Sequence, residues 1–439
     1  MKNNRRHFLK LTGAASLGIA GNSFFKNLPS LNGNIPFSFN DPVYSDLAGN
    51  ILQAGSADET TSIIGAYGQW AAGLSSKELP LLSFRRDNWK NPDKWRKAAR
   101  KMFAERLSMP EISGLPEVRI LKSYKYDGLL IEELQWNLRY GNPAEGILLK
   151  PADATGKLPG ILAFHDHAGN KYFGAKKITK TSDDQHPMMV THQKDLYQGY
   201  AWANDIARKG YVVLAPDAFP FASRRVMLKD IPVGQRQGLS DPGPDDIEGI
   251  RAYNSWAGQH ENIMAKSLFS AGTTWPGVLL AEDIKALDIL CSRDDVDTRN
   301  IGCCGLSGGG MRSVFLGGFD DRIKCAIPVG FMTTWRDLVL NKATSHTWMV
   351  YVPLLPKELD FPEILGLRVP LSSLVLNNSE DPLFSLEEMK RADEMLNNIF
   401  EKAGSGSNYK CSFHPARRRE CARPIVRGAR QSIRCARKC

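Results

Sequence analysis

The 439-residue sequence lacks any run of about 18 apolar residues, so it contains no ordinary membrane-spanning helix. It also lacks Cys-x-x-Cys pairs and zinc-ligand spacings, and its eight cysteines do not indicate a disulfide framework for the body of the chain. No internal repeat is present. Only 24% of residues are charged and 42% are apolar, which excludes wholesale disorder and favours a large folded core.

Acidic residues are scarce at the two ends of the chain, and the net charge of +10 comes from there. Residues 1–25 contribute +4 and residues 414–439 contribute +8, which leaves residues 26–413 at −2. Nucleic-acid binding depends on clustered basic side chains that neutralise phosphates. Because the body is mildly acidic, the sequence predicts no nucleic-acid partner.

The N-terminal segment has the two parts of a secretory signal. Residues 4–10 read Asn-Arg-Arg-His-Phe-Leu-Lys, and a weakly apolar run over residues 11–21 follows. The arginine pair resembles the twin-arginine export signal. That resemblance implies a bacterial protein with a signal peptide over residues 1–30, the twin-arginine machinery as its partner, and a periplasmic or secreted location. No Ala-x-Ala site fixes the cleavage point.

The body predicts an α/β fold with a mostly parallel central sheet and helices on both faces. Residues 118–150 read as antiparallel hairpins, and from residue 158 short apolar strands alternate with helical segments. Two stretches, 221–275 and 331–368, are too long for ordinary connections, and we expect them to form a lid or a substrate wall. The predicted parallel strands are 160–164, 211–215, 300–304, 323–329, 372–376 and 409–413.

One motif carries nucleophilic chemistry. Residues 305–309 read Gly-Leu-Ser-Gly-Gly, which fits Gly-x-Ser-x-Gly between an apolar strand and a predicted helix. Small residues on both sides of Ser307 allow a tight strand-to-helix turn, which lifts its hydroxyl to the helix N-terminus. We therefore predict that Ser307 is a nucleophile; the alternative is a structural glycine-rich turn.

This pattern resembles the α/β-hydrolases, in particular the dienelactone hydrolase-like and acetyl xylan esterase-like branch, over residues 85–413. The resemblance implies a serine carboxylic-ester hydrolase that forms an acyl-enzyme, without cofactor or metal. Its substrate would be a small-molecule or carbohydrate ester. Two alternatives are a catalytically dead protein of this fold and a serine peptidase of similar topology.

The family order of Ser, then Asp, then His suggests the acid. Asp381 follows the predicted strand 372–376 and precedes a proline, like the acid turn of the family. It would orient and stabilise an imidazolium. Glu380 is the neighbouring alternative, and a helix cap near Ser385 is the structural one.

The loop after the first parallel strand reads His-Asp-His-Ala-Gly over residues 165–169. It resembles the loop that supplies one backbone N–H to the oxyanion hole, and we expect His167 or Ala168 to donate there together with Gly308. A His-x-His pair with Asp217 could instead ligate a metal, although we predict no metal site.

The general base is the open question. His414 follows the last predicted strand, and residues 414–439 then turn Arg- and Cys-rich where the family has a closing helix. Three interpretations compete: His414 is the base, the base is missing because this tail is a frameshift product, or a histidine from an inserted segment earlier in the chain serves. Those histidines are His186, His192, His260 and His346.

Overall fold

The computed structural model describes residues 62–415. The predicted signal peptide and the tail from residue 416 lie outside the described residues. Within residues 62–415, no helix combines the length and the hydropathy that crossing a membrane requires.

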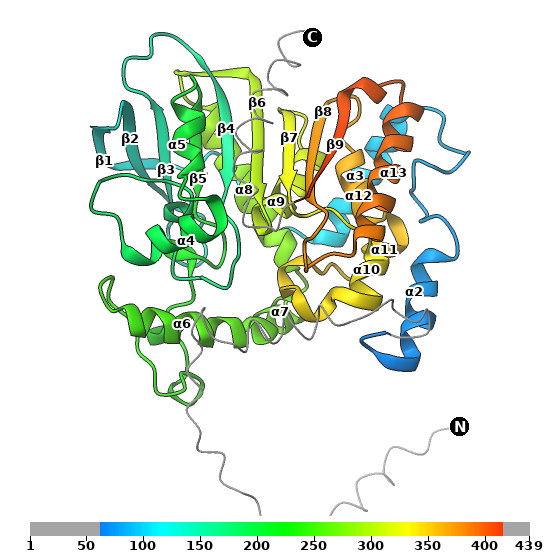
Figure 1. The fold of residues 1–439 in the computed structure, drawn as a ribbon, viewed down its shortest axis with the longest axis horizontal. Coiled ribbons are helices and arrows are strands. Elements are labelled where there is room, and N and C mark those ends of the chain that lie inside the picture. Colours follow the sequence, from blue (N-terminus) through cyan, green and yellow to red (C-terminus); the bar gives the residue numbers. More distant parts are fainter. Residues whose placement is uncertain (1–61, 416–439) are drawn as a thin grey trace, which may run out of the picture. The chain divides into compact units, whose positions relative to one another are not determined.

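A nine-stranded sheet forms the centre of the described chain, in the order β1-β2-β3-β5-β4-β6-β7-β8-β9 (Figure 1). The pairs β1–β2, β2–β3 and β3–β5 are antiparallel. The pairs β5–β4, β4–β6, β6–β7, β7–β8 and β8–β9 are parallel. The strands are β1 (Val118–Tyr126), β2 (Leu129–Trp136), β3 (Ala144–Pro151), β4 (Leu158–Phe164), β5 (Val212–Pro216), β6 (Val296–Leu306), β7 (Ile323–Val329), β8 (Ser372–Asn378) and β9 (Tyr409–His414).

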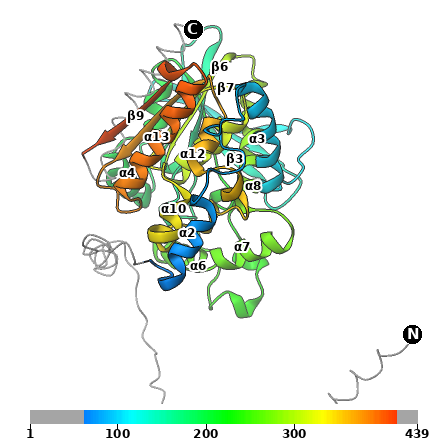
Figure 2. The ribbon, with the colours of Figure 1, turned by 90° about the vertical axis from the view of Figure 1, so that its right-hand side faces the viewer.

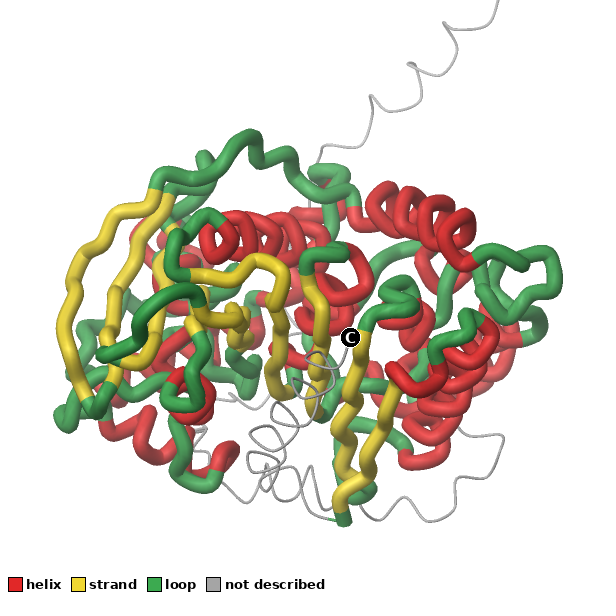
Figure 3. The backbone as a smooth tube through the Cα atoms, turned by 90° about the horizontal axis from the view of Figure 1, so that it is seen from above, coloured by secondary structure: helices red, strands yellow, loops and turns green. Residues whose placement is uncertain are grey.

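Helices surround this sheet on both sides (Figure 3). Within the described residues the α-helices are α2 (Gly68–Ser76), α3 (Pro92–Leu107), α4 (Pro187–Tyr197), α5 (Trp202–Ala207), α6 (Ile247–Gln259), α7 (Glu261–Ser270), α8 (Trp275–Cys291), α9 (Gly308–Phe319), α10 (Trp335–Asp337), α11 (Leu355–Glu358), α12 (Phe361–Gly366) and α13 (Leu386–Lys402). The predicted α/β fold, its antiparallel hairpins and its six parallel strands are confirmed.

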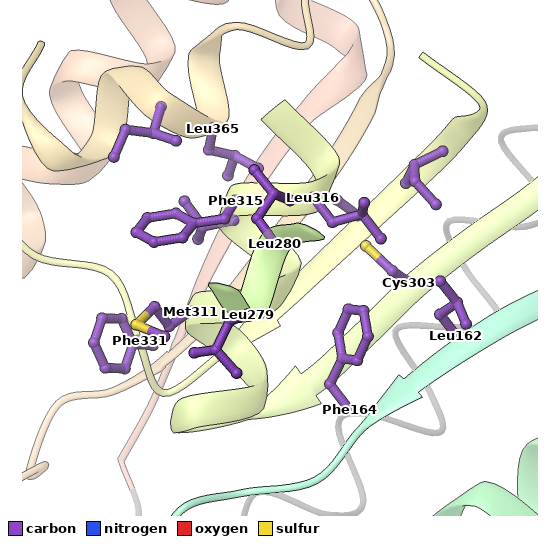
Figure 4. Close-up of a cluster of buried hydrophobic side chains, with 14 of the residues drawn as sticks. Leu162, Phe164, Leu279, Leu280, Cys303, Met311, Phe315, Leu316, Phe331 and Leu365 are labelled. Atoms are coloured by element: carbon purple, nitrogen blue, oxygen red, sulfur yellow. The ribbon is translucent and has the colours of Figure 1, made fainter. Parts of the chain in front are cut away.

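Alternation along β4 explains why both faces of the sheet are covered. Leu162 and Phe164 join the larger core with residues of α8, α9 and α12 (Figure 4), whereas Ile161 and Ala163 join a second core with residues of α5. Successive side chains of a strand point to opposite faces. A strand that is apolar at every position must therefore be buried on both sides, which is the pattern of the sequence here.

Local signals set where the main helices begin. α3 starts after Asn91, whose side chain accepts a hydrogen bond from the backbone N–H of Lys94 at 2.9 Å. α8 starts after Thr274, whose hydroxyl accepts from the N–H of Gly277 at 3.0 Å. Both helices carry a proline in the first turn, where its missing N–H costs nothing.

The two long stretches differ from one another in the structure. In the first, α6 and α7 lie beyond the carboxyl ends of the parallel strands (Figures 1 and 2). In the second, the part nearest β8 is not a lid, because Phe361, Ile364 and Leu365 of α12 are fully buried in the larger core. Segment length alone predicted a lid or a substrate wall over 331–368, and it could not distinguish a core helix from the rest of the segment.

The contact between α9 and α12 leads to a prediction. A Cβ atom at Gly318 would lie 2.0 Å from the backbone oxygen of Ile364, so Gly318→Ala must push the two helices apart. We expect a loss of about 2 kcal/mol or more in the free energy of unfolding, measured by chemical denaturation. Gly258→Ala on α6 is the control, because nothing lies within 4 Å of its Cβ position, and it should be neutral or stabilising. Equal effects of the two substitutions would show that α12 is loosely attached.

Candidate active site

Ser307 occupies a strained turn between β6 and α9. Its backbone has φ 59° and ψ −119°, a region that residues with a side chain rarely adopt and that costs of the order of 1–3 kcal/mol. Its N–H donates to the carbonyl of Val329 at 2.8 Å, which fixes the turn to the end of β7. Helix α9 begins at the next residue, so the hydroxyl stands at the positive end of the helix dipole.

Glycine is required on both sides of this turn. A Cβ atom at Gly305 would lie 2.5 Å from the carbonyl oxygen of Phe164, and one at Gly309 would lie 2.2 Å from the same oxygen. No side chain fits at either position without moving the backbone. The start of α9 therefore packs directly on the end of β4 and on the loop that follows it.

That loop, residues 165–169, brings backbone N–H groups to the serine turn. A Cβ atom at Gly308 would lie 3.2 Å from the backbone nitrogen of His167, so the two backbones are neighbours. Within the described residues, the N–H groups of His167 and Ala168 donate to no protein acceptor. These are the two residues that the sequence predicted as donors, and both N–H groups are free to bind an anion.

The imidazole of His167 is held by three neighbours. Its Nδ1 accepts from the N–H of Gly169 at 3.0 Å, so Nε2 carries the proton and donates to Glu261 Oε1 at 2.7 Å. The Nζ atom of Lys171 lies 3.2 Å from the same Nε2. Burial, followed by the charge of Lys171, lowers the pKa of His167. The ring is neutral and fully engaged, so it serves as an anchor for the loop.

Glu261 connects this loop to both long stretches. It begins α7 and forms an ion pair with the buried Lys171. Its Oε2 accepts from the hydroxyl of Thr347 at 2.6 Å and from the N–H of Trp348 at 3.3 Å. Burial alone would raise the pKa of Glu261, but His167 and Lys171 hold it well below its usual value. One carboxylate thus joins residues 221–275, residues 331–368 and the loop.

The alternative of a metal held by His165, His167 and Asp217 does not fit the contacts. Nδ1 of His165 donates to the carbonyl of Asp166 and Nε2 accepts from the N–H of Ala218, so neither nitrogen has a lone pair to offer. The carboxylate of Asp217 accepts from backbone and hydroxyl groups of residues 175 and 223. The described residues contain no cluster of three or more metal-ligating side chains.

Asp381 lies in the turn after β8 and is 4% exposed. Its Oδ1 accepts from the N–H of Leu383 at 3.0 Å, so it shapes the turn and does not cap α13, whose N-cap is Ser385. The alternative acid, Glu380, is exposed. Since β6 and β8 are parallel, Asp381 and Ser307 both follow carboxyl ends of strands and share one edge of the sheet.

His414 ends β9 at the same edge, in register with Asn378. Its Nε2 lies 3.4 Å from the hydroxyl of Ser412, and its backbone oxygen accepts from the N–H of Ser379 at 3.0 Å. Among the described residues the imidazole makes no hydrogen bond to Ser307 or Asp381. The structure brings the three predicted residues to one edge without joining them, so their assignment as a triad stays a prediction.

The other candidate bases contact groups other than Ser307, and one of them, His346, lies beside the acid turn. His186 uses both ring nitrogens on backbone groups, and His192 donates to the buried Asp166 at 2.9 Å. His260 stacks on Trp256. His346 lies beside the acid turn, since its Nε2 donates to the carbonyl of Leu383 at 2.9 Å.

A cavity of about 280 Å³ lies away from Ser307, which is not among its lining residues. Most of its lining residues come from β4, β6 and β7, and Lys157 and Tyr211 from the segments just before β4 and β5. We do not assign it to catalysis, because helix dipoles and connecting loops place ligands at the carboxyl ends of parallel strands.

Sequence reasoning missed three residues of the site. Lys171, Lys177 and Glu261 are buried, charged and in contact with the 165–169 loop or its side chains. The two lysines could have been noticed as cations closely following a His-Asp-His motif. Glu261 gave no signal, because it is 94 residues from His167 and its neighbourhood reads as an ordinary amphipathic helix.

The strain at Ser307 leads to a prediction on stability. Ser307→Gly should be more stable than Ser307→Ala by about 1 kcal/mol, because glycine adopts positive φ without steric cost. At Ser267, an exposed position within α7, the order should reverse, since glycine is about 1 kcal/mol worse than alanine in a helix. Urea denaturation of the four variants measures both differences. The same order at both positions would show that the turn is unstrained.

The Glu261 ion pair leads to a second prediction. Glu261→Gln leaves the buried Lys171 without a countercharge and should cost about 3 kcal/mol, whereas the exposed Glu248→Gln, which removes a surface pair with Arg251, should cost under about 0.5 kcal/mol. Because the folded pKa of Glu261 is lowered, its contribution is present above the unfolded pKa of about 4.3 and is lost as the pH falls below it.

Denaturation curves at pH 7, 5 and 3 check this sign. Between pH 5 and pH 3 the wild-type protein should lose more unfolding free energy than Glu261→Gln does. Equal losses of unfolding free energy in the two proteins would show that folding does not lower the pKa of Glu261.

The chain is similar to a protein described as a hydrolase and to solved esterase structures. No protein-family model matches the chain. A Bacillus subtilis (strain 168) protein described as a hydrolase, YtaP, is 23% identical over 294 residues, which cover 67% of this chain and 84% of that protein.

Two solved structures show the fold. One from Bacteroides fragilis NCTC 9343, described as an acetyl xylan esterase, has a TM-score of 0.56 at 17% identity and covers 82% of this chain and 84% of its own. Methylesterase BT1017 has a TM-score of 0.50 at 18% identity and covers 84% of this chain and 68% of its own. The described chain has the α/β-hydrolase fold.

Proposed function

We propose that the protein is a serine hydrolase of carboxylic esters. The observation that carries the proposal is the pairing of a strained serine turn with two unpaired N–H groups on the neighbouring loop, at the carboxyl edge of the sheet. A tetrahedral oxyanion needs such preorganised donors where its charge develops. The similarity to a hydrolase and to two esterase structures agrees with it.

In the proposed reaction, Ser307 attacks the ester carbonyl and the oxyanion binds the N–H groups of Gly308 and of His167 or Ala168. Collapse of the intermediate expels the alcohol and leaves an acyl-serine, which water hydrolyses in the second half. His414 takes the serine proton and returns it to the leaving alcohol, and Asp381 stabilises the imidazolium. For this role the His414 ring must turn away from Ser412.

Acetyl esters of a carbohydrate are the proposed substrates, by analogy with the acetyl xylan esterase structure, and methyl esters are the alternative by analogy with the methylesterase structure. The twin-arginine signal, bacterial export and a periplasmic or secreted location belong to the same proposal, since polymeric carbohydrates are met outside the cell. They depend on residues 1–30, which lie outside the described part.

A catalytically dead protein of this fold remains the second candidate, favoured by one observation. Within the described residues, no histidine makes a hydrogen bond to Ser307, and the residues after 415 carry no further histidine. Removal of one triad member leaves only about 10³–10⁴-fold catalysis over water. Sequencing the 3′ end of the gene tests the frameshift explanation directly.

The function test is hydrolysis of 4-nitrophenyl acetate by the wild-type protein and by Ser307→Ala. We expect Ser307→Ala to reduce kcat at least about a hundredfold, because the acyl-enzyme cannot form. A sulfonyl fluoride should label the wild-type protein at Ser307, as located by mass spectrometry. Wild-type and Ser307→Ala proteins with equal rates and equal labelling would refute the hydrolase proposal.

His414→Ala and His346→Ala identify the base. We expect His414→Ala to match the loss in Ser307→Ala, and His346→Ala to keep activity within about threefold. The opposite result would move the general base to His346, beside the acid turn.

A further inference from the structure

We propose that Lys177 is a positioning residue for the oxyanion hole: it holds two successive carbonyls of the 165–169 loop so that the N–H groups of His167 and Ala168 face the serine turn. The catalytic part of this inference rests on the proposed function. Its structural part, that Lys177 orders the loop, stands independently of it.

The contacts are direct. Nζ of Lys177 donates to the carbonyl oxygen of Asp166 at 2.9 Å and to that of His167 at 3.0 Å. The carbonyl of Asp166 also accepts from Nδ1 of His165 at 2.9 Å. Lys177 ends a short turn over Ala175–Lys177, which is tied down by a hydrogen bond from the N–H of Ala175 to Asp217 at 2.8 Å.

Peptide geometry converts these contacts into an orientation. In a trans peptide, the C=O of one residue and the N–H of the next point in opposite directions. Because the carbonyls of Asp166 and His167 both point at Lys177, the N–H groups of His167 and Ala168 both point away from it. The serine turn lies close to the first of these N–H groups, since a Cβ atom at Gly308 would stand 3.2 Å from the His167 nitrogen.

The charge of Lys177 is surrounded but not neutralised by a direct ion pair among the described contacts. The lysine is fully buried, its Nζ lies 4.5 Å from the centre of the Phe221 ring, and the nearby charged groups are Asp166, Lys171 and Asp217. Asp166 is itself held by His192 and by the hydroxyl of Tyr197, each at 2.9 Å.

Burying an ammonium group is costly unless it is well hydrogen-bonded, and here its bonds go to backbone carbonyls. A hydrophobic side chain of the same length would fill the space without that cost. We therefore assign two roles to the lysine: it orders the loop, and it polarises the two peptide groups so that their N–H ends favour a developing negative charge. Stability alone would favour a methionine.

The test compares Lys177→Met with Lys176→Met. Lys176 is the exposed neighbour in the same turn and serves as the matched control. Lys177→Met should reduce kcat for 4-nitrophenyl acetate about a hundredfold, as loss of one oxyanion donor does, with KM changed less than about threefold and thermal stability equal or higher. Lys176→Met should match the wild-type protein. An unchanged kcat would overturn the proposal. A fall in thermal stability together with a rise in KM above about threefold would overturn it as well.

The pH profile is a second readout that a purely structural lysine would not change. Burial lowers the pKa of Lys177 to about 8, and Lys171 adds to that shift while Asp166 and Asp217 oppose it. As the pH rises through about 8, the ammonium loses its charge, so kcat of the wild-type protein should fall severalfold. The alkaline fall should be absent in Lys177→Met. If that variant does not fold, a wild-type kcat that stays flat up to pH 10 overturns the proposal.

Hydrogen exchange separates failure of this proposal from failure of the esterase function. The N–H groups of Gly169 and Asn170 bond to the side chain and the carbonyl of His167, so their exchange reports the order of the loop without any catalysis. They should exchange at least about tenfold faster in Lys177→Met than in Lys176→Met. Equal exchange in the two variants overturns the proposal, whatever the hydrolase assay shows.

Discussion

The contact on which the site depends is backbone against backbone. The carbonyl oxygen of Phe164 lies where a Cβ atom would stand if residue 305 or 309 were not glycine. Because both positions lack a Cβ, α9 starts directly against the loop that follows β4. This contact brings Gly308, the residue after the strained Ser307, beside the backbone nitrogen of His167, and the buried network around Glu261 and Lys177 holds the loop. Two short sequence motifs become one site only through this close approach.

Much of the fold could be predicted because its signals are local. The strand predicted over 323–329 matches β7 (Ile323–Val329), and the strand at 300–304 lies within β6. Continuous apolar runs of this kind are buried on both sides in a parallel sheet. The serine turn was also predictable, because a tight strand-to-helix turn requires small residues at fixed offsets around Ser307. Segment length did not indicate α12: it predicted a lid or a substrate wall over 331–368, and the fully buried Phe361 shows that α12 belongs to the core.

The rest of the site could not be read from the sequence, because its contacts join distant segments. Glu261 meets His167 across 94 residues, and nothing near Glu261 marks it as a partner of a loop. The role of Lys177 depends on the direction of two carbonyls, which no residue pattern specifies. His414 shows the opposite difficulty: the sequence placed it at the expected edge, and the side chain there contacts Ser412. Position along a strand fixes the edge that a residue reaches, but not where its ring points.

The carboxylate of Glu261 has a consequence for how such a protein diversifies. It binds Thr347 of one long segment while itself belonging to the other, and it anchors the loop beside the serine. Exchanging residues 221–275 alone would leave the buried Lys171 without its countercharge, and exchanging residues 331–368 alone would leave Oε2 of Glu261 without the Thr347 hydroxyl. Two segments joined in this way would be inherited as a matched pair, and recombination that keeps the pair together would be the route that preserves the buried contacts.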